Sequence, residues 1–117
     1  MNTLLKLEEA AMTLASIALM YLLGVPLSGW VYFLLFFSPD LGMLGYLINT
    51  RVGALGYNLF HHKGIAVLVA MAGYFLAMDY LTLAGLLLFG HSSFDRIWGY
   101  GLKFPDSFKN THLGMLK

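Results

Sequence analysis

Histidine and aspartate side chains stand out in a chain that is otherwise largely apolar, and their spacing limits the chemistry they could perform. His91 and Asp95 are four residues apart, so on a helix they share one face. An aspartate one turn from a histidine can fix the imidazole tautomer and raise its basicity, as acid–base catalysis requires. His91 and Asp95 are therefore the candidate catalytic pair.

Further side chains could join this pair as metal ligands. Imidazole together with carboxylate suits Zn²⁺, Fe²⁺ or Mn²⁺, and helical bundles build such sites from side chains on facing helices. His61 and His62 are consecutive, so on a helix they point about 100° apart and one of them is expected to face the centre. The candidate cofactor is a divalent metal (Zn, Fe or Mn), and its candidate ligands are Asp40, His61, His62, His91 and Asp95.

Two other interpretations of the same residues stay open. An Asp/His chain in a membrane could transfer protons or ions. The same groups could instead pair only with one another and hold the helices together. The chain contains neither an H-E-x-x-H nor an E-x-x-H motif, so no motif of this kind decides between the interpretations.

The surroundings of these residues are typical of a membrane protein. The chain has 117 residues, of which 59% are hydrophobic and 11% charged, against about 25% charged in ordinary soluble domains. This length suits one domain, and the net charge of +1 argues against nucleic acid as a partner. There is no cysteine, which excludes disulfides and thiolate metal sites.

Long apolar segments predict an all-α fold, an integral membrane four-helix bundle formed by a single transmembrane domain over residues 1–117. The expected helices span about residues 7–23, 26–48, 54–78 and 79–101, and a cytoplasmic tail follows over 102–117. Pro26 suits the first turn of the second helix, where its missing N–H would be unpaired anyway. The second helix is expected to be kinked or broken at Ser38-Pro39-Asp40, because proline removes an internal hydrogen bond.

The basic residues predict the orientation of this bundle. In the four-span arrangement all seven lie on or near the side shared by both termini and the 49–53 turn. Basic residues favour the cytoplasmic side, so we expect a multi-pass protein of the cell membrane with both termini in the cytoplasm. A rise of about 1.5 Å per helical residue then places Asp40, His61 and His91 about 10–12 Å in from the cytoplasmic ends. The site is expected to open to the cytoplasm, where His112 of the tail could cover it.

Several motifs of the chain resemble those of a known family. They are Ser38–Gly42, Asn58–His62, His91–Arg96, Gly99–Lys103 and Thr111–Gly114. Together they are similar to a family of small bacterial integral membrane proteins that is catalogued as a domain of unknown function. The resemblance covers nearly the whole chain, and it implies a bacterial origin and a membrane location. It implies no catalytic role for any residue, because the family has no established activity.

Three classes of function fit this sequence. The first is an enzyme that uses a cytoplasm-facing intramembrane site for metal- or His/Asp-assisted chemistry on a lipid or other apolar small molecule. The second is a non-catalytic module that binds a ligand, a lipid or another membrane protein, and the third is a subunit for ion or proton transport. The few polar residues in the outer half favour the first two. Beyond the lipid bilayer, partners stay open, a homo-oligomer among them.

Overall fold

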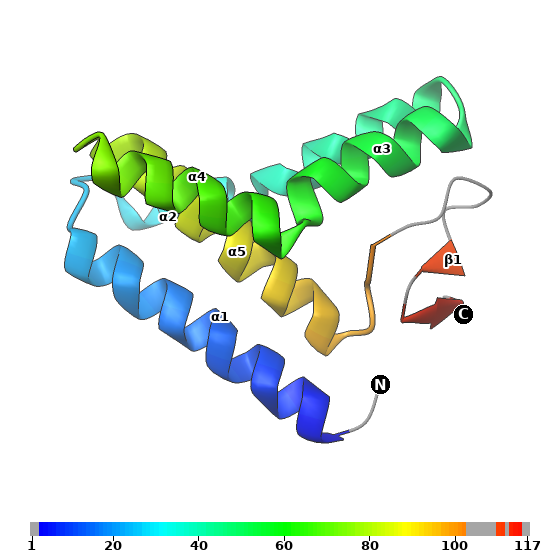
Figure 1. The fold of residues 1–117 in the computed structure, drawn as a ribbon, viewed down its shortest axis with the longest axis horizontal. Coiled ribbons are helices and arrows are strands. Elements are labelled where there is room, and N and C mark those ends of the chain that lie inside the picture. The colour runs from blue at the N-terminus through cyan, green and yellow to red at the C-terminus, as the bar shows by residue number, and fades with distance from the viewer. Residues whose placement is uncertain (1–2, 103–109, 112, 116–117) are drawn as a thin grey trace.

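The computed structural model describes residues 3–102, 110–111 and 113–115 of the chain. Its elements are α1 (Thr3–Leu23), α2 (Gly29–Phe37), the 3₁₀ helix η1 (Ser38–Leu47), α3 (Thr50–His61), α4 (Lys63–Phe75), α5 (Asp79–Ile97), β1 (Asn110–Thr111) and β2 (Gly114–Met115). The two strands form one short antiparallel pair. All other elements are helical (Figure 1), so the predicted all-α class is confirmed.

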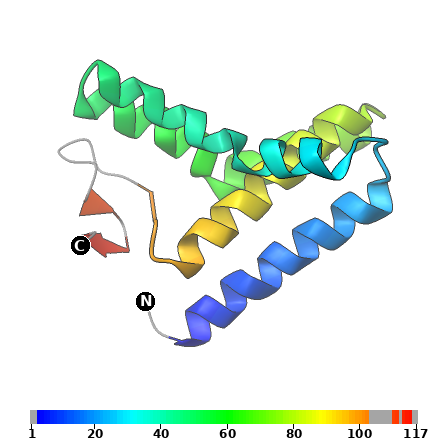
Figure 2. The same ribbon diagram turned by 180° about the vertical axis from the view of Figure 1, so that it is seen from behind.

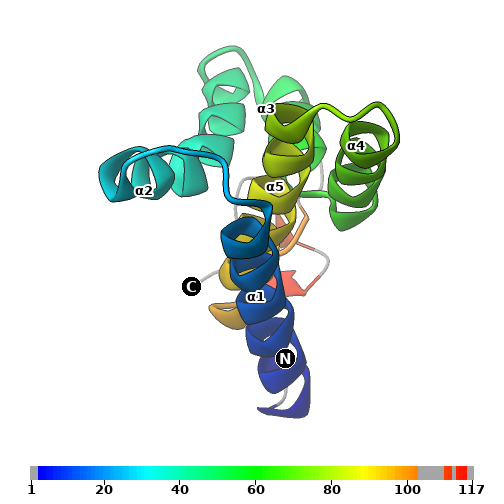
Figure 3. The same cartoon turned by 90° about the vertical axis from the view of Figure 1, so that its left-hand side faces the viewer.

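Helix α5 lies at the centre of the fold, between α1, α4 and α2 (Figure 3). Helices α1 and α4 pack along it most extensively, whereas α3 packs mainly against η1. Seen from behind, α2 continues into η1, which extends away from α1 and returns as α3 (Figure 2). The end of α5 that holds the predicted site residues therefore lies within reach of η1 and of the end of α3.

The expected second helix changes its winding at Ser38, as the sequence predicted. Pro39 has no N–H to donate to the carbonyl of Leu35, and the Ser38 hydroxyl donates to that carbonyl instead, at 2.7 Å. The chain continues as a 3₁₀ helix of 10 residues, whereas such runs longer than about 3–4 residues are uncommon. Close packing against α3 supports η1, because a Cβ on Gly42 would lie 2.7 Å from the Gly56 carbonyl oxygen.

The predicted start of that helix at Pro26 is wrong. The helix begins at Gly29, and Ser28 is its N-cap. A serine oxygen can accept from the free N–H groups of a first helical turn, and the Ser28 side chain accepts from the Val31 N–H. The five residues before Gly29 form the connection from α1, in which Gly24 has a positive φ of 70°.

The expected third helix, over residues 54–78, is in fact two helices joined at His62. The backbone of His62 is extended, with φ −86° and ψ 115°. Its Nδ1 accepts a hydrogen bond from the Ile65 N–H at 3.2 Å, which caps the first turn of α4. Gly64 makes room for the imidazole, since a Cβ there would lie 2.7 Å from the His62 ring. His61 therefore ends α3 as a buried residue, while His62 is exposed.

Small residues bring α4 and α5 close together. Ala66 is fully buried and Gly73 is buried. A Cβ on Gly73 would collide with the backbone of Thr82, and a Cβ on Gly85 would collide with Ala70. Close approach of this kind is common between helices in lipid. There the hydrophobic effect does not drive helix association, and small residues permit the van der Waals packing that does.

By length and composition, one helical segment among the described residues could cross a membrane, namely Gly29–Leu47, which comprises α2 and η1. The sequence predicted four such spans. Helices α1 and α5 have 21 and 19 residues, but each includes three charged side chains, which in α1 lie near its N-terminus and in α5 lie at both ends.

Candidate metal centre

Four of the five predicted metal ligands converge on one point. Asp40 comes from η1, His61 from the last residue of α3, and His91 and Asp95 from one face of α5. One ligand atom from each of these four residues lies within 4.8 Å of the other three. Asp40 lies in the first turn of η1, two residues after the change of winding at Ser38.

Five of the six distances between the ligand atoms are close to those of a tetrahedral site, and the sixth, between the two carboxylate oxygens, is no longer than 4.8 Å. The Nε2 atoms of His61 and His91 are 3.1 Å apart. Asp40 Oδ1 lies 3.4 Å from His61 Nε2 and 3.0 Å from His91 Nε2. Asp95 Oδ2 lies 3.1 Å from each of the two nitrogens. A tetrahedral ion with bonds of about 2.0–2.1 Å separates its ligand atoms by about 3.3–3.4 Å, so these five edges match to within a few tenths of an ångström.

Hydrogen bonds satisfy only part of this cluster. An imidazole nitrogen carries one proton at most, and an ionised carboxylate carries none. Yet His91 Nε2 has three polar neighbours at 3.0–3.1 Å, and His61 Nε2 has three at 3.1–3.4 Å. A divalent cation at the centre would accept all four lone pairs at once and offset the charges of the two carboxylates.

The surroundings of His61 fix its ring in the orientation that a metal ligand needs. Its Nδ1–H donates to the Tyr57 backbone carbonyl at 2.9 Å, which leaves the Nε2 lone pair facing the cluster. The Tyr57 ring stacks on the imidazole at a centroid distance of 3.8 Å and an angle of 6°. Contacts of this kind orient ligating histidines in metalloproteins. The sequence analysis did not include Tyr57, although it precedes His61 by one helical turn.

His91 is enclosed by apolar rings. Its side chain is fully buried, and the rings of Phe36 and Phe37 lie 5.8 and 5.9 Å from it. Its Nδ1 has no hydrogen-bond partner among the described residues. Leaving a buried donor unpaired costs about 1–3 kcal/mol. Such a cost is tolerable where the other nitrogen, Nε2, gains a stronger interaction.

The cluster is open on one side only. The side chains of His61 and His91 are 3% and 0% exposed, that of Asp95 is 16% exposed, and that of Asp40 is 40% exposed. Water or a substrate could therefore approach beside Asp40. A catalytic metal site needs such an open position, whereas structural sites are closed by protein ligands.

One histidine of the predicted ligand set lies elsewhere. His62 is exposed and caps α4, so it points away from the cluster. The expectation for His112 concerns a position outside the described residues. The sequence analysis did not predict one further polar contact. Lys63 forms an ion pair with Glu9, and this pair joins α4 to α1.

The comparison with known families agrees with the sequence motifs. The family model described as "Domain of unknown function (DUF4260)" matches residues 2–116. The chain belongs to this family. No curated protein and no solved structure matches the chain. All four converging side chains of the DUF4260 chain lie inside the matched region. The family thus confirms the resemblance, and the chemistry has to be inferred from the site itself.

Proposed function

We propose that this protein is an integral membrane metalloprotein that binds one divalent cation through Asp40, His61, His91 and Asp95. We further propose that the bound cation assists chemistry on a lipid or another apolar substrate. The observation that carries the proposal is the spacing of the four ligand atoms, with five edges of 3.0–3.4 Å around one centre. Two ionised carboxylates and two neutral imidazoles also supply the charge that balances a divalent ion.

The ligand set favours Zn²⁺ among the candidate metals. Two imidazole nitrogens and two carboxylate oxygens at tetrahedral spacing suit zinc, whose bonds to both atom types are about 2.0–2.2 Å. Fe²⁺ and Mn²⁺ accept the same donor types but are commonly found with more ligands. The paired imidazoles disfavour Ca²⁺ and Mg²⁺, which take oxygen ligands.

The surface of the protein supports a location in the bilayer. Large apolar side chains are exposed on α1, α2, η1 and α4, among them Leu14 at 67%, Trp30 at 75%, Leu47 at 85% and Leu68 at 66%. Soluble monomers rarely expose contiguous apolar patches larger than a few hundred Å². We propose four passes, formed by α1, by α2 with η1, by α3 with α4, and by α5. The positions of the basic residues favour both termini in the cytoplasm.

The division of roles within the site follows from exposure. A Zn²⁺ ion held by these side chains would supply Lewis acidity for the attack of water on an ester or phosphoester. His61 and His91, buried and fixed by their neighbours, hold the geometry. Asp40 stands at the opening, where its second carboxylate oxygen can accept a proton from an incoming water. The role proposed for Asp95 is to complete the site from the face of α5 that also carries His91.

A non-catalytic metal site is the second candidate, because four protein ligands complete a tetrahedron without water. Both candidates share one decisive experiment, the metal content of the full-length protein purified in detergent. We expect about one equivalent of Zn per chain, as a single tetrahedral site requires. His91→Ala should lose it, whereas His62→Ala, a change of the adjacent histidine outside the cluster, should keep it. If the wild-type protein retains no Zn²⁺ after incubation with Zn²⁺, the proposal is wrong.

Turnover of an apolar ester separates the two candidates. With p-nitrophenyl palmitate as the probe, the catalytic candidate predicts hydrolysis by the Zn-loaded wild type and none by His91→Ala. Stoichiometric Zn without any turnover of such esters or of phosphodiester analogues would favour the structural site.

A further inference from the structure

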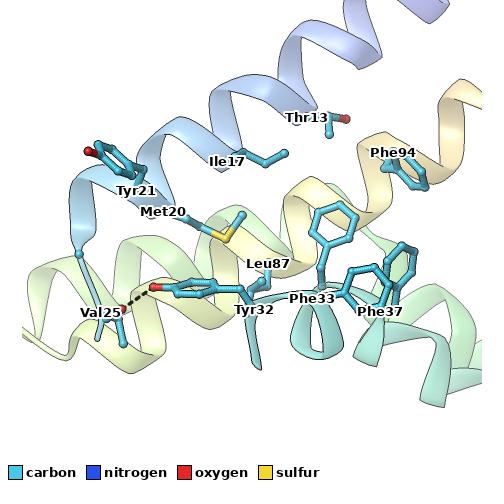
Figure 4. Close-up of a pocket in the computed structure, with 12 residues that line it drawn as sticks. Thr13, Ile17, Met20, Tyr21, Val25, Tyr32, Phe33, Phe37, Leu87 and Phe94 are labelled. Atoms are coloured by element: carbon cyan, nitrogen blue, oxygen red, sulfur yellow. Dashed lines mark hydrogen bonds between the residues drawn. The ribbon is translucent and has the colours of Figure 1, made fainter. Parts of the chain in front are cut away.

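A cavity of about 710 Å³ lies between α1, α2 and α5 (Figure 4). Ligand pockets are commonly about 300–1,000 Å³ in volume. The walls include Ile17 and Met20 from α1, Phe33 from α2 and Leu87 from α5. Ile17 and Phe33 are 46% and 55% exposed, so the cavity is open at the surface between α1 and α2.

The lining of this cavity offers an occupant almost no polar contact. Its residues include no charged side chain. The Thr13 hydroxyl donates to the Glu9 carbonyl at 2.9 Å, and the Tyr32 hydroxyl donates to the Val25 carbonyl at 2.6 Å. Two of the three hydroxyl protons of the lining are thus used within the protein, and the third belongs to Tyr21, which is 85% exposed. A polar molecule would lose its hydration here without compensation, whereas a hydrocarbon chain would lose nothing.

The length of the cavity matches the depth of one membrane leaflet. Along α1 it extends from Thr13 to Gly24. Eleven helical positions at about 1.5 Å each give about 16 Å, which is close to half of the ~30 Å hydrocarbon core. An acyl chain of a membrane lipid has about the same length.

One end of the cavity borders the metal centre. Phe37 and Phe94 lie at this end with Thr13, while Tyr21 and Val25 lie at the other (Figure 4). The Phe37 ring also packs against the His91 imidazole, with centroids 5.9 Å apart. Phe94 directly precedes Asp95 on α5. A chain lying in the cavity would therefore carry its polar end to the level of the metal ligands.

We infer that this cavity holds one acyl chain of a membrane phospholipid, whose headgroup lies beside the Asp40–His61–His91–Asp95 centre. The open wall between Ile17 and Phe33 lets one chain enter from the side while the second chain stays in the bilayer, which favours a two-chain lipid. A phosphate headgroup complements a cation bound at the centre. The placement of the headgroup rests on the proposed function, whereas the occupancy of the cavity by an acyl chain does not.

Ile17→Trp tests the inference by filling the cavity, and Leu19→Trp is its matched control. Both residues lie on α1 with similar exposure, 46% and 51%, but Leu19 is not part of the cavity wall. Full-length protein stripped of lipid in detergent is titrated with 1-palmitoyl-2-oleoyl phosphatidylglycerol, and bound lipid is counted by native mass spectrometry. We expect one lipid per chain for wild type and Leu19→Trp, and binding weaker by about tenfold or more for Ile17→Trp, because the indole takes space that the acyl chain would occupy.

Phe33→Trp provides a second filled cavity, in case Ile17→Trp does not fold. Unchanged phospholipid binding by the folded variants, no binding by wild type, or binding of oleic acid in place of the phospholipid would each overturn the inference. Zn content is measured on the same samples. If the wild-type protein binds Zn²⁺ but no phospholipid, only this inference is refuted. If it binds the phospholipid but no Zn²⁺, only the proposed metal centre is refuted.

Discussion

The Nε2 atoms of His61 and His91 lie 3.1 Å apart, although the two residues are 30 positions apart in the chain. His61 has its Nδ1 hydrogen-bonded to the Tyr57 carbonyl, so its Nε2 presents a lone pair. Two imidazole nitrogens at this distance need a proton or a cation between them, because two lone pairs repel. Two carboxylate oxygens at 3.0–3.4 Å from the same atoms favour the cation.

Removal of the metal should destabilise the protein. A ligand present at about 100 times its Kd stabilises the folded state by about 2.7 kcal/mol, which for a domain of about 100 residues corresponds to a fall in Tm of roughly 10 °C or more on chelation. The measurement is thermal unfolding in detergent with Zn²⁺ and with a chelator. His62→Ala should show the same difference as wild type, and His91→Ala should show none. Equal Tm values for wild type under both conditions would contradict the prediction.

The Tyr57 ring should act as a positioning group for His61. In Tyr57→Ala the stacked ring is lost and His61 can rotate, so Zn affinity should fall by about 10–100-fold, as for other outer contacts of metal ligands. Tyr57→Phe keeps the ring and should bind Zn²⁺ much more tightly than Tyr57→Ala. Since both variants lack the hydroxyl, the difference between their Kd values, measured by competition with a zinc chelator, reports the ring alone. Equal Kd values would show that stacking is irrelevant to the site.

Pro39 should be needed for the position of Asp40 more than for stability. Pro39→Ala restores an N–H that can bond to the Leu35 carbonyl, so α2 can continue past Ser38 and move Asp40 away from the histidines. We expect Zn affinity to fall by about tenfold or more, as for the loss of an orienting contact, with the unfolding free energy within about 1 kcal/mol of wild type. Pro26→Ala, in the connection before α2, is the control and should leave affinity unchanged. If Pro39→Ala binds Zn²⁺ with the Kd of the wild type, Pro39 does not position Asp40.

Much of the site could be predicted from the sequence, for identifiable physical reasons. His91 and Asp95 share a helix face because they are four residues apart. Pro39 predicts a change of winding because a proline inside a helix removes a backbone hydrogen bond. The choice of His61 over His62 could not be predicted, because it depends on the His62 side chain capping α4 and ending α3 one residue earlier. The N-cap at Ser28 could not be predicted, because Pro26 is equally suited to a first helical turn.

The orientation proposed for the bundle can be tested with reporters. All seven basic residues lie near the side of the two termini in a four-pass arrangement, so tags at both ends should be cytoplasmic. A reporter inserted beside Asp79, in the turn between α4 and α5, should be outside. The measurement is accessibility of each reporter to a membrane-impermeant reagent in intact cells. A C-terminal tag found outside would exclude four passes.

Asp40→Asn should separate the catalytic from the structural form of the metal centre. The change keeps the size of the side chain but removes the charge and the proton-accepting oxygen at the only well-exposed position of the site, where the Asp40 side chain is 40% exposed. Three ligands remain, as in catalytic zinc sites. The catalytic form therefore predicts retained Zn with turnover of p-nitrophenyl palmitate reduced by about 10²–10⁴-fold, the usual contribution of a general base. Asp95→Asn, the matched change at the more buried carboxylate, should instead lose Zn. If Asp40→Asn retains full turnover, Asp40 is not the base; if it lowers only the Tm of a protein that shows no turnover, the centre is structural.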